Sequence, residues 1–173
     1  MMKAKHIYFC ALGLIFIVAL VLVAHRQYVV NSGTTILVPL GSGKNAKTID
    51  SDYVYLRYKN LIPQKQLEAE QGKIIVYVNS FGVASFVKVY HSGDELKYGE
   101  HILDYHIYRP FGLTPAKPRV YFASYRYRYT DKDNQYNYRN ARYAVLKVND
   151  DGFALLTGLA DANYNLINKD FRF

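Results

Sequence analysis

The longest uninterrupted apolar stretch in the sequence lies near its N-terminus, from residue 7 to residue 24. Its eighteen residues, IYFCALGLIFIVALVLVA, include no charged side chain and no polar stripe. As a helix this stretch would be about 27 Å long, at about 1.5 Å per residue, which is close to the roughly 30 Å hydrocarbon core of a bilayer. The pattern therefore predicts a transmembrane helix rather than a buried helix of a globular core.

The rest of the chain alternates apolar and polar residues with the period of two that is typical of β-strands. The best-defined strand is expected from Asp50 to Tyr58, where aromatic and β-branched residues are frequent. Tyr53, Tyr55 and Arg57 fall on one face of this strand, and mainly apolar side chains fall on the other.

Two tight hairpins are also expected. One is centred on Ser80-Phe81-Gly82 between residues 73 and 90, and the other on Asp150-Asp151-Gly152 between residues 143 and 159. One short helix is expected between residues 61 and 72, and strands do not alternate with helices. These signals predict a mainly β fold, an antiparallel β-sandwich or a partly open barrel, preceded by a single N-terminal transmembrane helix.

Charged residues on either side of the apolar run predict its orientation. Lys3 and Lys5 precede the run and Arg26 follows it, so the positive-inside rule places the short N-terminus in the cytoplasm. A cleaved signal peptide is the alternative. Cleavage after Ala24 would put Leu22 where a small residue is preferred, which favours an uncleaved anchor.

The apolar run and the strands after it divide the chain into two expected parts. These are a signal anchor with its flanks, residues 1–30, and an extracytoplasmic β-rich domain, residues 31–173. Residues 25–34 are expected to form a short polar connection. The only cysteine, Cys10, lies inside the apolar run, so an intrachain disulfide is impossible. The formal net charge of +8 allows attraction to anionic lipid, polysaccharide or nucleic acid, and a location behind a membrane anchor argues against nucleic acid.

A short motif lies within the best-defined strand. Asp52, Tyr53, Leu56 and Tyr58 form the pattern Asp-Tyr-x-x-Leu-x-Tyr. Together with the hairpin at residues 143–159, which ends in Gly-Leu, this pattern resembles the bacterial GDYXXLXY-motif family. The resemblance implies an N-terminal anchor and a β-rich outer domain, in agreement with the apolar run and the strands.

The resemblance has two departures and two further implications. Ser51 stands where the family motif has glycine, and the segment that begins at Tyr121-Phe122 lacks the family's Tyr-Phe-Val-Pro-Glu-Gly strand. The resemblance implies a single-pass protein of the bacterial inner (cytoplasmic) membrane with its C-terminal domain on the periplasmic side. Because family members are often encoded beside multi-pass membrane proteins, it also implies a multi-pass membrane partner.

Two groups of residues are candidates for binding. Asp52 stands at the start of the motif strand, where it could bind a ligand or accept backbone N–H bonds in an Asx-turn, and the structural role is favoured. The motif tyrosines and Leu56 are expected to pack. The segment Tyr125-Arg126-Tyr127-Arg128-Tyr129 places tyrosines on one face and arginines on the other, which is typical of a binding face or of a solvated sheet edge.

No catalytic constellation is recognised. Ser80, Ser85 and Ser92 lie near Lys88 and Lys97 in the sequence, but none of these serines stands in a recognisable nucleophile turn.

No metal site and no cofactor are expected. His101, Asp104 and His106 belong to one predicted strand, on which three ligands would not converge on a metal.

The sequence favours a membrane-anchored, non-enzymatic β-domain that acts as an accessory or assembly subunit of a bacterial envelope complex. Two alternatives from other classes stay open: an envelope hydrolase or peptidase, and a glycan- or anionic-polymer-binding module.

Overall fold

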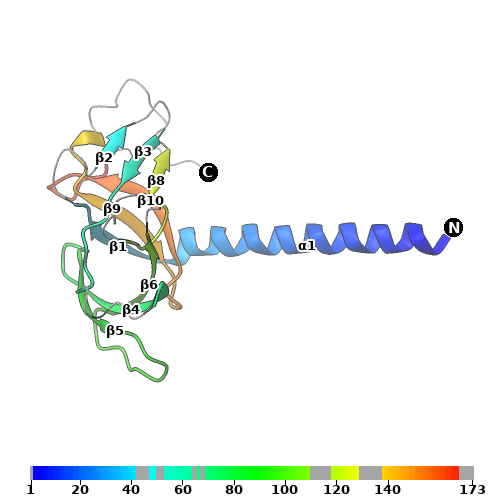
Figure 1. The fold of residues 1–173 in the computed structure, drawn as a ribbon, viewed down its shortest axis with the longest axis horizontal. Helices are drawn as coiled ribbons and strands as arrows, with labels where there is room; N and C mark the ends of the chain where they lie inside the picture. Colours follow the sequence, from blue (N-terminus) through cyan, green and yellow to red (C-terminus); the bar gives the residue numbers. More distant parts are fainter. Residues whose placement is uncertain are drawn as a thin grey trace.

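The computed structural model describes residues 2–41, 47–49, 53–63, 66, 69–109, 118–128 and 138–167. A long helix, α1 (Met2–Ser32), projects from a β-rich domain like a rod (Figure 1). Ten strands follow it in the described part of the chain: β1 (Thr34–Pro39), β2 (Lys47–Ile49), β3 (Tyr53–Leu56), β4 (Gln71–Val78), β5 (Ala84–Val89), β6 (Glu100–Tyr108), β7 (Arg119–Tyr121), β8 (Arg126–Arg128), β9 (Tyr143–Val148) and β10 (Ala154–Ala160).

The described strands form three antiparallel sheets. Their orders are β1-β9-β10, β2-β3-β8 and β5-β4-β6-β7, and the strands curl into a half-barrel (Figure 1). The predicted mainly β, antiparallel fold with one N-terminal apolar helix is therefore confirmed.

Both predicted hairpins are present, as β4–β5 and β9–β10. Gly82 and Gly152 turn them, each with a positive φ that a residue with a side chain rarely adopts. The helix expected between residues 61 and 72 falls partly on residues outside the described set, and Gln71 at its expected end already belongs to β4.

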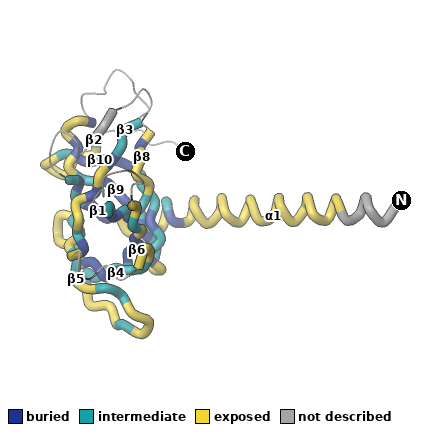
Figure 2. Tube along the Cα trace, viewed as in Figure 1, coloured by how far each residue is buried: buried dark blue, intermediate teal, exposed yellow. Residues whose placement is uncertain are grey.

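The predicted membrane-spanning run lies within α1. The helix is long enough and apolar enough to cross a bilayer, and its side chains are exposed along most of its length, as Figure 2 shows in yellow. The polar connection expected at residues 25–34 is wrong, because α1 continues to Ser32 and β1 begins at Thr34. The polar residues of this segment form the last turns of the helix, beyond the apolar run. They do not mark the end of the helix.

The last turns of α1 pack against the domain. Val29 is fully buried, and the ring of His25 lies 5.5 Å from the ring of Phe153. Only Gly33 separates the helix from β1, and its carbonyl oxygen accepts a 3.0 Å hydrogen bond from Nζ of Lys147. The helix and the domain therefore meet without a flexible linker.

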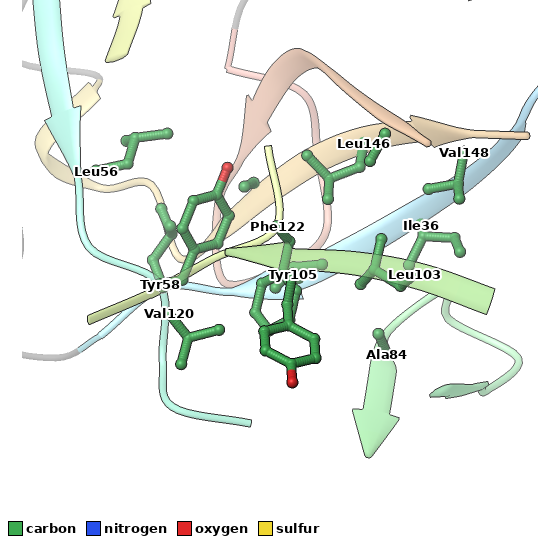
Figure 3. Packing of buried hydrophobic residues seen from close by; sticks show 14 of the residues in the cluster. Ile36, Leu56, Tyr58, Ala84, Leu103, Tyr105, Val120, Phe122, Leu146 and Val148 are labelled. Carbon is green, nitrogen blue, oxygen red and sulfur yellow. The ribbon is translucent and has the colours of Figure 1, made fainter. Parts of the chain in front are cut away.

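One apolar cluster connects the three sheets. It includes Ile36 and Leu146 from the β1-β9-β10 sheet, Leu103 from β6, and Phe122 and Tyr58 from segments that follow β7 and β3. Figure 3 shows these side chains meeting from their separate elements. Burying such residues stabilises the fold by about 1.5–3 kcal/mol for each large side chain, so the core fixes how the sheets are placed on one another.

The close approach at Gly33 leads to a first prediction. A Cβ atom at residue 33 would lie 2.4 Å from the carbonyl oxygen of Val29 and 3.0 Å from that of Val148, both backbone atoms that cannot rotate away. Gly33→Ala should therefore cost about 1–3 kcal/mol, as overpacking does. The measurement is thermal unfolding of the full chain in detergent, followed by circular dichroism.

Gly13→Ala is the matched control, because a Cβ atom there would meet nothing within 4 Å. Equal melting temperatures for the two variants would contradict the tight junction between α1 and β1.

Candidate functional site

The motif strand β3 lies beside β8, so the two sequence segments singled out above are neighbours in space. Tyr53 stands opposite Arg128, and Tyr55 stands opposite Arg126. Residues directly opposite one another in an antiparallel pair share a face of the sheet. Two tyrosines and two arginines, about 70 positions apart in the chain, thus occupy one face.

The opposite face of the same strand pair points into the core. Val54 and Tyr127 stand opposite one another and are both buried. The structure therefore divides the candidate segment: Arg126 and Arg128 are exposed, while Tyr127 packs inside. Tyr129, the last residue of that candidate segment, lies outside the described residues.

The outward-facing residues form a connected surface, which we call the tyrosine–arginine face. Tyr125, Arg126 and Arg128 are exposed and Tyr53 and Tyr55 are half-buried. The rings of Tyr55 and Tyr125 stack with their centroids 6.4 Å apart and their planes 27° apart. Cζ of Arg126 lies 5.1 Å from the ring centroid of Tyr125 and 5.8 Å from that of Tyr53. A guanidinium at such distances is attracted to the faces of the rings.

Two motif residues form hydrogen bonds to the segment that carries this face. The backbone N–H of Leu56 donates a 2.8 Å hydrogen bond to the carbonyl oxygen of Tyr125. The hydroxyl of Tyr58 donates one of 2.9 Å to the backbone carbonyl oxygen of Ser124. The side chain of Ser124 in turn accepts a bond from the N–H of Arg126 at 3.1 Å. The motif strand thus fixes the turn that presents Tyr125 and Arg126.

Tyr121 joins the surface tyrosines to the core. Its ring centroid lies 5.7 Å from that of Tyr125 and 6.1 Å from that of Tyr58, and Tyr58 lies 5.7 Å from Phe122. The Tyr58 pairs are edge-on, at 90° and 89°, the arrangement that aromatic rings favour. Sequence reasoning missed Tyr121 and Ser124, because no local pattern showed that the segment after β7 returns to β3.

Burial keeps two tyrosine hydroxyls protonated. Desolvation, with a smaller contribution from Tyr121, raises the pKa of Tyr58 well above its ordinary value. Desolvation, with a smaller contribution from Tyr138, raises the pKa of Tyr127 to about 12. Both hydroxyls therefore keep their protons at a higher pH than an exposed tyrosine does. The Tyr58 hydroxyl remains a hydrogen-bond donor to Ser124 over that range.

Two of the residues considered for catalysis, Ser85 and Lys88, have other partners in the structure. Oγ of Ser85 donates to the carbonyl oxygen of Tyr77 at 3.2 Å. Nζ of Lys88 forms an ion pair with Asp94, and this hydrogen bond is the main cause that lowers the pKa of the Asp94 carboxyl.

Metal-binding groups are not gathered in the part of the chain that the structure describes, where no three His, Cys, Asp or Glu side chains come together. Asp104 forms an ion pair with Lys73, Nζ to Oδ1 2.9 Å. Asp52, the polar candidate in the motif, lies outside the described residues.

An apolar N-terminal helix, long enough to cross a membrane, joined to a small antiparallel β-domain with a hydrogen-bonded tyrosine strand defines the class of this protein. The family model described as GDYXXLXY protein matches residues 15–159, which is most of the chain. The chain therefore belongs to the GDYXXLXY family, and the predicted resemblance is confirmed. No curated protein and no solved structure matches it.

The buried hydroxyl of Tyr58 leads to a second prediction. Tyr58→Phe removes the hydrogen bond to Ser124 and should cost about 0.5–1.5 kcal/mol at neutral pH. The folded protein raises the pKa of Tyr58 above its unfolded value of 10.0, so the stability linked to this group is complete below pH 10 and is lost as the pH rises further. The variant should therefore lose less stability than the parent between about pH 9 and pH 11.

Melting temperatures of the full chain across that pH range provide the measurement. Tyr98→Phe is the control, since Tyr98 is fully exposed and should leave both the neutral-pH stability and its alkaline decline unchanged. Parallel alkaline curves for parent and Tyr58→Phe would refute the role assigned to burial of this hydroxyl.

Proposed function

We propose that this protein is a membrane-anchored, non-enzymatic accessory or assembly subunit of a bacterial envelope complex. In this proposal residues 1–30 form a single-pass anchor in the inner (cytoplasmic) membrane, and residues 31–173 form a domain on the periplasmic side. The tyrosine–arginine face binds the partner, a multi-pass membrane protein.

The observation that carries this proposal is the contact of exposed Tyr125 and Arg126 with half-buried Tyr55 and with one another. Tyrosine and arginine are the side chains enriched at the energetic centres of protein interfaces. Tyr125 keeps 45% of its surface exposed although it contacts two other tyrosine rings. Rings held in advance by hydrogen bonds and stacking lose little conformational entropy when a partner binds, which favours affinity.

The junction between α1 and the domain supports a membrane partner in particular. Since Gly33 alone separates the helix from β1, the orientation of the domain follows that of the helix. A domain held in this way presents its faces at a fixed height above the bilayer, as suits a partner in the same membrane.

The hydrolase alternative is less well supported. A serine nucleophile needs a neighbouring base that is free to take its proton, and Lys88 pairs with Asp94 while Ser85 bonds to a backbone carbonyl.

The partner is tested by affinity isolation of the full chain from membranes solubilised in mild detergent. We expect a multi-pass membrane protein to be recovered with the parent. Arg126→Ala should weaken the complex by about tenfold or more, since removal of a central arginine commonly costs over about 1.4 kcal/mol.

Tyr98→Ala removes an exposed aromatic side chain outside the tyrosine–arginine face and should leave recovery unchanged. Parent protein that is recovered alone and monodisperse would contradict an accessory role.

The topology is tested separately with C-terminal fusions to the full chain. Lys3 and Lys5 favour a cytoplasmic N-terminus by the positive-inside rule. An alkaline phosphatase fusion should therefore be active, and a fluorescent protein that matures only in the cytoplasm should be dark. The opposite pair of results would reverse the proposed orientation.

A further inference from the structure

A cleft of about 770 Å³ lies apart from the tyrosine–arginine face, where strand ends from all three sheets meet. The end of β1, the residues after β3, the start of β7 and the start of β9 all contribute to its lining. Its volume is within the roughly 300–1,000 Å³ that is typical of small-ligand sites.

The lining of this cleft carries positive charge. It includes Arg57, Lys59, Arg119 and Arg142, and no acidic residue of the described chain contributes. The ion pairs found in that part of the chain involve none of these four residues. Three of the four are exposed and Arg119 is half-buried, so all four can reach a ligand.

The backbone beneath these side chains is firmly hydrogen-bonded. The N–H of Gly41 donates to the carbonyl oxygen of Arg57, and the N–H of Lys59 donates to that of Pro39, both at 2.8 Å. The carbonyl oxygen of Arg142 accepts a 2.8 Å hydrogen bond from the N–H of Leu40, the residue after β1. The N–H of Arg142 donates one of 2.7 Å to the carbonyl oxygen of Ala160, the last residue of β10. The backbone therefore fixes the points from which the four side chains line one cleft. An anion bound in the cleft would reduce the repulsion among these like charges.

Tyr58 contributes to this arrangement from the core side. It lies between Arg57 and Lys59 in sequence, lines the cleft, and buries its ring. The last tyrosine of the motif thus anchors the segment that carries two of the four charges.

The cleft lies at the end of β1 that is remote from the membrane helix. Thr34, next to α1, pairs with Val148, whereas Pro39, at the cleft, pairs with Tyr143. Five residues of strand separate these ends, about 17 Å at about 3.3 Å per residue. The cleft therefore opens at the end of the β1-β9 pair away from α1, where a ligand dissolved in water can reach it.

We propose that this cleft binds a phosphate-bearing ligand, a diphosphate or a comparable multiply charged group. Guanidinium groups match phosphate oxygens with paired hydrogen bonds, and three arginines and a lysine exceed what a single carboxylate would neutralise. This site does not depend on the tyrosine–arginine face or on a protein partner.

The test is calorimetric titration of the full chain, in detergent, with inorganic pyrophosphate. We expect saturable binding that weakens as salt is added, and acetate should bind at least about tenfold more weakly. Arg57→Gln/Arg142→Gln should weaken pyrophosphate binding by about tenfold or more.

Lys97→Gln/Arg109→Gln is the matched control, because it removes two positive charges from exposed positions outside the cleft. Binding that falls equally in both double variants would show attraction to net charge alone and would overturn the proposal, as would the absence of saturable binding to the parent. If Arg57→Gln/Arg142→Gln melts at a lower temperature than the parent, the titration is repeated with Lys59→Gln, which changes an exposed side chain. This variant should also weaken pyrophosphate binding.

The cleft variant should leave recovery of a membrane partner unchanged, so failure of this inference and failure of the proposed accessory role give different results.

Discussion

One hydrogen bond from a tyrosine in the core joins two distant segments around which the binding surfaces are arranged. A tyrosine O–H removed from water costs free energy unless it finds an acceptor, and the acceptor for Tyr58 is the carbonyl oxygen of Ser124, 66 positions away in sequence. Ser124 lies in the segment that leaves the β5-β4-β6-β7 sheet after β7 and joins β3 as β8. The bond therefore ties the residue that follows the motif strand to the segment that connects β7 with β8. It also sets where Tyr125 and Arg126 reach the surface and where the Arg57–Lys59 segment meets the cleft.

A second constraint acts where α1 meets the domain. Most of α1 exposes apolar side chains (Figure 2). In its last turns, however, Val29 is fully buried and the ring of His25 lies 5.5 Å from that of Phe153. One helix thus has two environments, and Gly33 permits the change because a side chain there would collide with backbone on both sides. The last turns of the helix are therefore part of the domain's packing.

Local patterns predicted several elements of this fold but not their assembly. The apolar run, the period of two and the glycine turns predict α1 and both hairpins, because each signal acts within a few residues. The pairing of β3 with β8 could not be predicted, since it depends on the shared core around Tyr58 and Phe122 rather than on sequence spacing. The same reason explains why Tyr127 is buried while Tyr125 is exposed: β8 begins at Arg126, and Tyr125 lies in the turn before it. The polar residues before Ser32 were misleading because packing against β9 and β10 extends the helix beyond its apolar run.

The spacing of the motif follows from the two sides of β3. Tyr53 is an odd number of positions from both Leu56 and Tyr58, so a period of two places it on the outer face and the other two on the inner face. On the outside, Tyr53 lies under the guanidinium of Arg126; on the inside, Leu56 and Tyr58 fill the core and bond to the turn that carries that arginine. A spacing that placed all three on one face would lose either the core contacts or the ring beneath Arg126. The motif therefore positions Arg126 in two ways. Tyr53 contacts its guanidinium on the outer face of β3, and Leu56 and Tyr58 bond on the inner side to the residues that precede it.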